Sequence, residues 1–405
     1  MRPPATSASE TQTISTLLMV LLSMNAFIVS AVLRVVDTLI PSISADFQVS
    51  AGEISIIVTG FAIGFGMSTL VHGGLADRFG KLRIIAAGAM LGGVFTMLCG
   101  SAENLTTLTI YRFFSGVFIS ACVSISMAHI ADNVAYQFRQ AAIGRYLTGI
   151  MFGTFFGGML GGLIIDWVGW QAVFLVYGFV AFLSGLAIDA YHRRSSKQPK
   201  PISSTSLSLS NYLNVFQKKS VQRVCAITFV EGIVFFGTSA FLGALIQNRF
   251  DTNYLTVGIL LGCFGIGGLV YTSLVKQFVK YLNEIQFVLI GGLTVSATIL
   301  AFAFVNTTWP LAFLMGFMGF GFYMMHNTLQ TKASEASPAN RGIVMALFSS
   351  AIFLGQSVGA VLVGHLIDYL DYTITFLLSS IAFTIIILWF AHQIPSGVLG
   401  SEFRK

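Results

Sequence analysis

The sequence predicts an all-α membrane protein in which twelve transmembrane helices form two pseudo-symmetric six-helix bundles. Of its 405 residues, 55% are hydrophobic and only 9% are charged, and the mean hydropathy is +0.81. A soluble domain carries about 25% charged residues. Two further observations support the prediction: apolar runs of spanning length recur along the chain, and the second half repeats a pattern of the first.

Twelve apolar runs are close to, or longer than, the roughly 20 residues that a helix needs to cross hydrocarbon. We expect these helices at 14–40, 52–72, 83–101, 105–129, 141–165, 170–190, 221–247, 254–278, 284–304, 309–330, 342–365 and 372–392. A polar interval rich in Ser, Lys and Arg separates the first six from the last six and predicts a flexible linker. The expected divisions are a cytoplasmic N-terminus 1–13, a bundle 14–190, a cytoplasmic linker 191–220, a bundle 221–392 and a cytoplasmic tail 393–405.

Charge bias predicts the orientation. With both termini in the cytoplasm, nearly all Lys and Arg residues fall in cytoplasmic loops, and Arg249 is the cation left outside. The opposite loops carry acids, namely Asp46, Glu53, Glu103, Asp166, Asp251, Asp368 and Asp371. Because Lys and Arg in short loops resist translocation, this partition favours a multi-pass protein of a bacterial inner membrane.

The two halves repeat without a gap. When Arg139–Leu175 is placed on Arg341–Leu377, glycines match glycines and Ile165-Asp166 matches Ile367-Asp368. Two bundles of the same orientation, related by an axis along the membrane normal, follow from this match. Such bundles rock around a central cavity.

A charged stretch joins the second and third helices and predicts a tight turn in water. Its pattern consists of Gly73, Asp77, Arg78, Gly80, Lys81 and Arg83. The pattern resembles the loop signature of the major facilitator superfamily, although Leu82 replaces a usual basic residue. The resemblance implies that Asp77 acts as a cytoplasmic gate by engaging the start of helix eleven, at 338–341, in the outward-facing state.

Glycines recur every four residues in the fifth helix, at Gly149, Gly153 and Gly157, with Gly158 beside them. This spacing permits close packing with a partner helix, and packing alone would explain it. The stretch is also similar to the superfamily's antiporter signature, except that Thr154 replaces a proline.

Three charges lie inside the apolar runs of helices one and four. Arg34 and Asp37 share a helical face, and Arg112 lies at a similar depth below the outer surface. A charge there costs about 2.5–3.5 kcal/mol on insertion scales, so each needs a partner or water. The run Asp37–Pro41 resembles the helix-one signature of twelve-helix drug/proton antiporters, and the surroundings of Arg112 resemble a helix-four signature linked to proton coupling. We expect Asp37 to bridge Arg34 and Arg112; a structural ion pair, or an Arg34 that reaches outward, are the alternatives.

Glu231 is the other acid near the middle of the bilayer, in helix seven. We predict a proton site or a cationic-substrate site there, against the alternative of a hydrogen-bonded structural acid. The predicted proton-coupling residues are therefore Asp37, Arg112 and Glu231.

A polar stripe in helix ten combines Tyr323, His326 and Asn327. With Asn25, Gln356, Arg34, Asp37 and Glu231, these residues form the predicted substrate cavity. A surrounding rich in Phe and Met suits varied apolar ligands.

These features predict a secondary active transporter that acts by alternating access. The leading hypothesis is proton-coupled efflux of a small amphipathic compound or metabolite by a monomer that needs no cofactor or metal. Proton-coupled uptake of an organic acid or sugar is the alternative, and a non-transporting membrane sensor is the alternative of another class. No HExxH motif, paired carboxylates or Ser/His/Asp cluster favours an enzyme. The net charge of +6 is spread through loops without the continuous basic face that binds nucleic acid.

Overall fold

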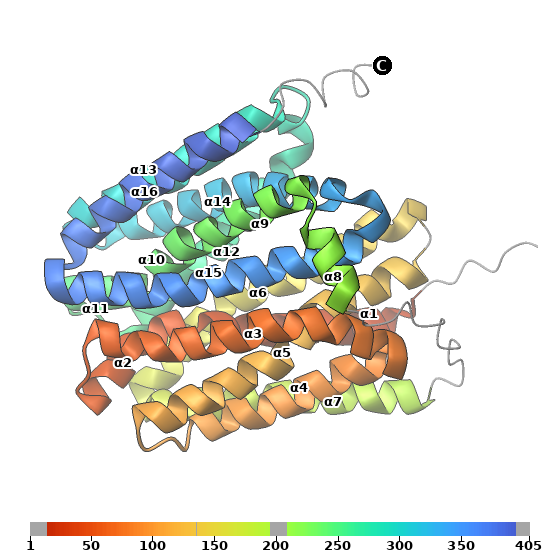
Figure 1. The fold of residues 1–405 in the computed structure, drawn as a ribbon. Helices are drawn as coiled ribbons and strands as arrows, with labels where there is room; N and C mark the ends of the chain where they lie inside the picture. Colours follow the sequence, from red (N-terminus) through yellow and green to blue (C-terminus); the bar gives the residue numbers. More distant parts are fainter. Residues whose placement is uncertain (1–13, 135, 195–208, 394–405) are drawn as a thin grey trace, which may run out of the picture.

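The computed structural model describes residues 14–134, 136–194 and 209–393. Within these ranges every regular element is helical, and the helices run side by side in two stacked bundles (Figure 1). The predicted N-terminus 1–13, residues 195–208 of the linker and almost all of the tail lie outside the described residues.

The N-terminal bundle is built from seven helices that make six membrane-spanning rods. They are α1 (Thr16–Arg34), α2 (Val36–Phe47), α3 (Ala51–Phe79), α4 (Lys81–Cys99), α5 (Leu105–Asn133), α6 (Tyr136–Val168) and α7 (Trp170–Arg194). α1 and α2 form one rod that is interrupted at Val35.

The C-terminal bundle also has six rods, preceded by a short helix. The elements are α8 (Leu209–Phe216), α9 (Lys219–Glu231), the π-helix η1 (Gly232–Phe236), α10 (Gly237–Ser239), α11 (Leu242–Phe250), α12 (Tyr254–Phe278), α13 (Glu284–Phe304), α14 (Trp309–Ala336), the 3₁₀-helix η2 (Pro338–Asn340), α15 (Arg341–Leu370) and α16 (Tyr372–Gln393). α9 to α11 together form the seventh rod of the protein.

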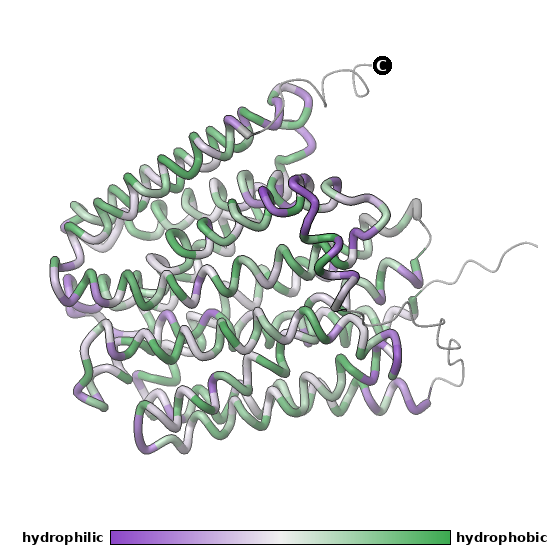
Figure 2. Tube along the Cα trace, viewed as in Figure 1, coloured by the Kyte–Doolittle hydropathy of each residue, from purple (hydrophilic) through white to green (hydrophobic). Residues whose placement is uncertain are grey.

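Eleven of the described rods are long and apolar enough to cross a membrane, and α14 is the twelfth. α14 has 28 residues, but its glycines, His326 and Asn327 lower its hydropathy. It packs against α12, α13 and α15, so its polar residues have protein neighbours. Most of the residues in the middle of the rods are hydrophobic, and hydrophilic residues gather at the ends of the rods (Figure 2).

Two expectations about connections were wrong. The charged stretch after Gly73 is not a turn: α3 continues to Phe79, and the chain reverses at Gly80 alone, where φ is +96° and glycine is favoured. Nothing before Gly80 breaks the helix, so α3 carries Asp77 and Arg78 in its last turns. The linker is not irregular throughout either, because its described part forms α8, whose Val215 is buried against the C-terminal core.

We call the end of the bundles that carries Arg78, Lys81 and Arg194 the basic end, and the end that carries Asp166 and Asp368 the acidic end. They lie at the right and left of Figure 1, respectively. The halves meet along three helix pairs, α3 with α15, α6 with α12, and α2 with α11. These pairs place residues of α2 and α11 between the bundles.

Candidate functional site

Asp37 lies where the two bundles meet, beside a local backbone defect. Pro41 lacks an N–H, so the carbonyl four residues earlier, that of Asp37, loses its helical hydrogen bond. Gly243 of α11 packs against this carbonyl so closely that a Cβ would lie 2.0 Å from its oxygen. The side chain of Asp37 then pairs with Arg34, with Oδ2 and Nη1 3.6 Å apart.

A small pocket of about 30 Å³ surrounds this ion pair. It is lined by Arg34, Asp37, Thr154, Gly158, Phe235, Ser239, Leu242, Leu261, Phe264, Met315 and Met318, which come from both bundles. The Arg34 guanidinium lies 4.8 Å from the ring centre of Phe236 and 5.8 Å from that of Phe264. Such a volume holds a water molecule but no larger compound, so a substrate would enter only when the bundles move apart.

Arg112 is buried in the N-terminal bundle without a full set of partners. Its side chain is 2% exposed, its guanidinium lies 4.2 Å from the ring centre of Phe61, and Nε and Nη1 donate no hydrogen bond within the described ranges. Asp37 lies within electrostatic reach, yet no ion pair between the two is formed. Asp37 therefore pairs with Arg34 and not, as expected, with both arginines.

Glu231 and His326 form a pair inside the C-terminal bundle that the sequence analysis did not foresee. His326 Nδ1 lies 2.9 Å from Glu231 Oε1, Glu231 is 1% exposed, and its Oε2 has no partner in the described structure. The imidazole stacks on Phe322 with ring centres 4.9 Å apart. The sequence predicts Glu231 near the bilayer middle and His326 in the polar stripe of helix ten, and no signal in the sequence joins the two residues.

A π-helix connects the two charged pairs. It begins directly after Glu231, and its last residue, Phe236, contacts Arg34. Phe236 also packs edge-on against Phe322, with ring centres 5.5 Å apart. Single π turns inside α-helices are frequent at functional sites because the extra residue shifts the side chains that follow.

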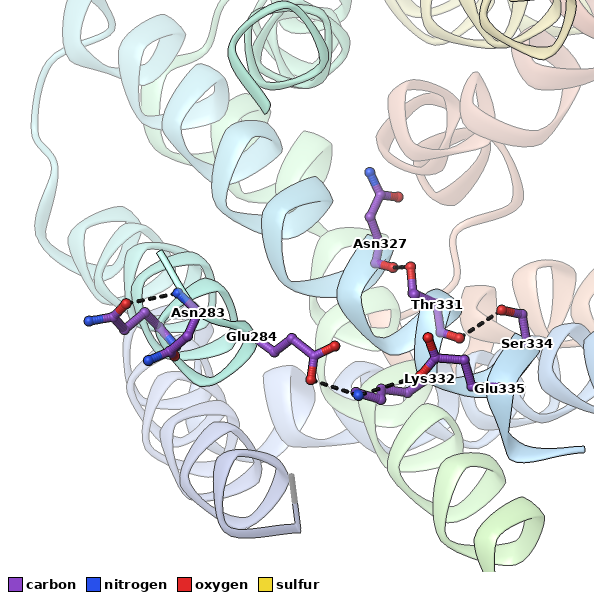
Figure 3. Close-up of polar contacts among 8 residues, drawn as sticks. Asn283, Glu284, Asn327, Thr331, Lys332, Ser334 and Glu335 are labelled. Atoms are coloured by element: carbon purple, nitrogen blue, oxygen red, sulfur yellow. Dashed lines mark hydrogen bonds and ion pairs between the residues drawn. The ribbon is translucent and has the colours of Figure 1, made fainter. Parts of the chain in front are cut away.

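The remaining cavity candidates divide into two groups. Tyr323 packs on Phe264 in the C-terminal bundle, and Gln356 lies beside Gly232 in the same bundle, both close to the π-helix. Asn327 follows His326 on α14, and its carbonyl accepts a bond from Thr331 (Figure 3). Asn25 is set apart, because it is fully buried in the N-terminal bundle and donates to Ser184 of α7.

The basic end shows the predicted gate motif in a disengaged state. Among the described residues, no hydrogen bond or ion pair joins Asp77 to 338–341. A Cβ added to Gly73 or Gly80 would meet no atom of another element within 4 Å. Lys81 instead forms an ion pair with Asp132 at the end of α5.

The C-terminal bundle has an equivalent contact with the charges exchanged. Glu284 at the start of α13 accepts from Lys332 near the end of α14, with oxygen and nitrogen 2.6 Å apart (Figure 3). Lys332 also reaches Glu335 at 3.5 Å. Each bundle thus ties the start of its third rod to the end of its fourth, a pairing that the sequence analysis missed.

The glycines of the fifth predicted helix, here α6, serve close packing. A Cβ on Gly149 or Gly153 would lie 2.4 or 2.1 Å from a carbonyl oxygen of α1, and one on Gly157 would overlap Ala31. Gly158 faces the other bundle, where Gly258 of α12 lies against it.

Two carboxylates close the acidic end. Asp368 of α15 accepts bonds from the N-terminus of α3: from Ser50 Oγ at 2.8 Å, from the N–H of Ala51 at 3.0 Å and from the N–H of Gly52 at 2.8 Å. Asp166 of α6 accepts from the N–H groups of Tyr254 and Leu255 at the start of α12, both at 2.9 Å.

Each carboxylate therefore caps a helix of the opposite bundle, where unpaired N–H groups and the helix dipole favour an anion. We call these two contacts the acidic latches. The gapless repeat had already matched Asp166 with Asp368, but it could not reveal what they bind.

Comparison with known proteins decides the family. The family model described as Major Facilitator Superfamily matches residues 22–340 and 286–402. The chain belongs to the Major Facilitator Superfamily. The fold agrees: the chain superposes on the nucleoside transporter NupG with a TM-score of 0.74 at 12% identity, covering 93% of this chain and 100% of that one.

Relatives within the superfamily are distant. The chain is 26% identical to the uncharacterized transporter YwfA of Bacillus subtilis over 86% of this chain and 85% of that protein. It is 23% identical to a bicyclomycin resistance protein homolog of Haemophilus influenzae, covering 81% of this chain and 83% of that protein. An uncharacterized transporter of Buchnera aphidicola is 26% identical, but the match spans only 49% of its length and 51% of this chain. As a member of the superfamily, the protein is a transporter and not an enzyme.

Proposed function

We propose that this Major Facilitator Superfamily transporter exports a small amphipathic compound in exchange for protons. The observation that carries the proposal is the pair of ionisable clusters inside the helix bundles, Asp37–Arg34 and Glu231–His326, whose side chains are at most 17% exposed. Buried ionisable residues in membrane helices mark ion and substrate paths. The relation to a bicyclomycin resistance protein homolog supports export of a foreign compound.

The composition of the pocket supports an amphipathic substrate. Phe, Met and Leu side chains surround a single ion pair, so an apolar body and one polar group would both find partners. Substrate binding at Arg34 and Asp37 would shift the ring of Phe236, which packs against Phe322, and Phe322 in turn stacks on His326. The proton on the Glu231–His326 pair and the substrate are thereby placed in competition.

The latches suggest which way the substrate leaves. With the acidic end closed and Asp77 disengaged, the described arrangement corresponds to a state from which the bundles would move apart at the basic end to admit substrate. The basic residues place that end in the cytoplasm by the positive-inside rule. Protonation from outside would follow once the latches open. A ligand can shift the equilibrium between the state closed at the acidic end and the state open there only if its affinity for the two states differs.

A transport assay tests the direction of coupling. A thermal-shift screen of amphipathic compounds at two pH values supplies a ligand, and the purified protein is then placed in proteoliposomes with an imposed pH gradient. Export predicts that the compound moves against the proton flow and that a gradient collapsed by an ionophore stops its accumulation. Accumulation in the same direction as the protons would contradict antiport.

Arg112 supports a second candidate, uptake of an organic acid together with protons. Its buried Nε and Nη1 atoms without partners would suit a carboxylate, and Phe61 beside it would suit an apolar or aromatic body. The same proteoliposome assay separates the two functions by the direction of movement.

A further inference from the structure

A groove runs along the outside of the N-terminal bundle in the half that lies toward the basic end. It has a volume of about 1060 Å³ and is lined by α1, α6 and α7 together with the end of α5. Its floor is the exposed face of α1 that carries Val20 and Met24, and its walls include Phe152 of α6 and Leu183 of α7. The groove is about thirty-five times the volume of the central pocket and is mostly apolar.

The groove opens to the lipid and not to the transport path. Thr154 of α6 lines the central pocket, whereas Arg145 of the same helix lines the groove. The two residues are nine positions apart, which is about two and a half helical turns, so they lie on opposite sides of α6. The α1 residues that line the groove extend from Thr16 to Ile28, about 18 Å along the helix axis, which is more than the roughly 15 Å depth of one hydrocarbon leaflet.

Positive charge is confined to the basic end of the groove. Arg145 is exposed, lies about 6 Å inside the start of the apolar segment at Ala141, and forms no ion pair with a described residue. Arg194 lies two turns beyond Ala187 on the same face of α7 and is likewise exposed without a described ion pair. The neighbouring Arg193 is neutralised by Asp189 at 2.7 Å, which leaves Arg145 and Arg194 as cations without a described ion pair near the basic end of the groove.

We propose that this groove binds an anionic phospholipid of the leaflet at the basic end, with an acyl chain in the apolar trough and the phosphate between Arg145 and Arg194. The apolar length alone would accept any lipid. The two unpaired cations at its mouth supply the preference for a net negative headgroup, because basic residues near a membrane surface attract anionic lipids. The proposal does not depend on what the protein transports.

Native mass spectrometry of the purified full-length protein tests the proposal. Phosphatidylglycerol is added in one arm and phosphatidylcholine with the same acyl chains in the other. We expect one phosphatidylglycerol to remain bound, and Arg145→Ala to weaken it about fivefold, the effect of about 1 kcal/mol for one cation at an anionic surface. Arg145→Gln, which keeps most of the stem, should weaken it equally. Arg223→Ala, which removes an exposed cation of α9 at the same end, should leave the affinity unchanged.

A second pair of variants tests the trough itself. Leu183→Trp fills the groove and should reduce binding of both lipids, whereas Leu293→Trp, at a position of equal exposure on α13, should not; the two leucines are 45% and 44% exposed. Equal affinity for the two lipids would overturn the headgroup assignment. Binding that is indifferent to Leu183→Trp, or a dimer mass that replaces the lipid adduct, would overturn the groove as a lipid site.

Discussion

Removing the charge of Asp368 should open the acidic end. This carboxylate receives three hydrogen bonds from the first turn of α3 in the other bundle, at 2.8–3.0 Å. The variant Asp368→Asn keeps the size of the side chain but removes its charge and turns an amide N–H₂ toward N–H donors. Because the contact is exposed, we assign it about 1–2 kcal/mol, between the dipole contribution and a charged hydrogen bond. The ratio of closed to open molecules should then fall by about 5- to 30-fold.

Double electron–electron resonance measures this ratio directly. Spin labels at Ser101 and Thr308, both in acidic-end loops of different bundles, report the separation in a background without native cysteines. The long-distance population should grow in Asp368→Asn and grow further when Asp166→Asn is added. Asp371→Asn is the matched control, because this acidic-end carboxylate caps Ile374 within its own bundle. Unchanged distances in the double variant would refute the latch.

Three further variants test separate parts of the structure. Glu231→Gln should abolish transport driven by a pH gradient but keep substrate exchange, because the glutamine cannot carry a proton. If the variant in proteoliposomes still transports substrate in response to the pH gradient, Glu231 is not part of the mechanism. Gly153→Ala should destabilise the protein by about 1–3 kcal/mol through overpacking against α1, while Gly144→Ala, with open space around it in the same helix, should not lower the melting temperature, because alanine favours the helix over glycine. Arg249→Ala should lower the melting temperature by several degrees, because the guanidinium donates hydrogen bonds to three carbonyls at the end of α13 and to the hydroxyl of Thr373. An unchanged melting temperature would show that water replaces these hydrogen bonds without loss of stability.

The sequence carried enough information for the helices because a spanning segment must be apolar along its whole length. α14 is less apolar than the other spanning helices because it carries His326 and Asn327. It can do so because neighbouring helices pack around it. The position of the reversal was harder to predict. Charges at Asp77 and Arg78 indicate water, but a helix can continue into water until a residue such as Gly80 ends it.

Pairing across helices could not be read from the sequence in the same way. Glu231 and His326 are 95 positions apart and meet only because α9 and α14 pack together. The π-helix after Glu231 depends on packing of the following phenylalanines rather than on a local residue signal. Asp166 and Asp368 matched in the repeat, yet their partners belong to the other bundle, whose position the sequence did not supply.

Proton release on ligand binding is the most direct measure of the proposed competition. The detergent-purified protein in weak buffer is mixed with the ligand from the thermal-shift screen, and the pH is followed with a soluble indicator. Antiport predicts that protons are released into solution when the ligand binds, and that Glu231→Gln reduces the release. Proton uptake on binding, or binding without any proton movement across the range from pH 5 to 8, would contradict the account.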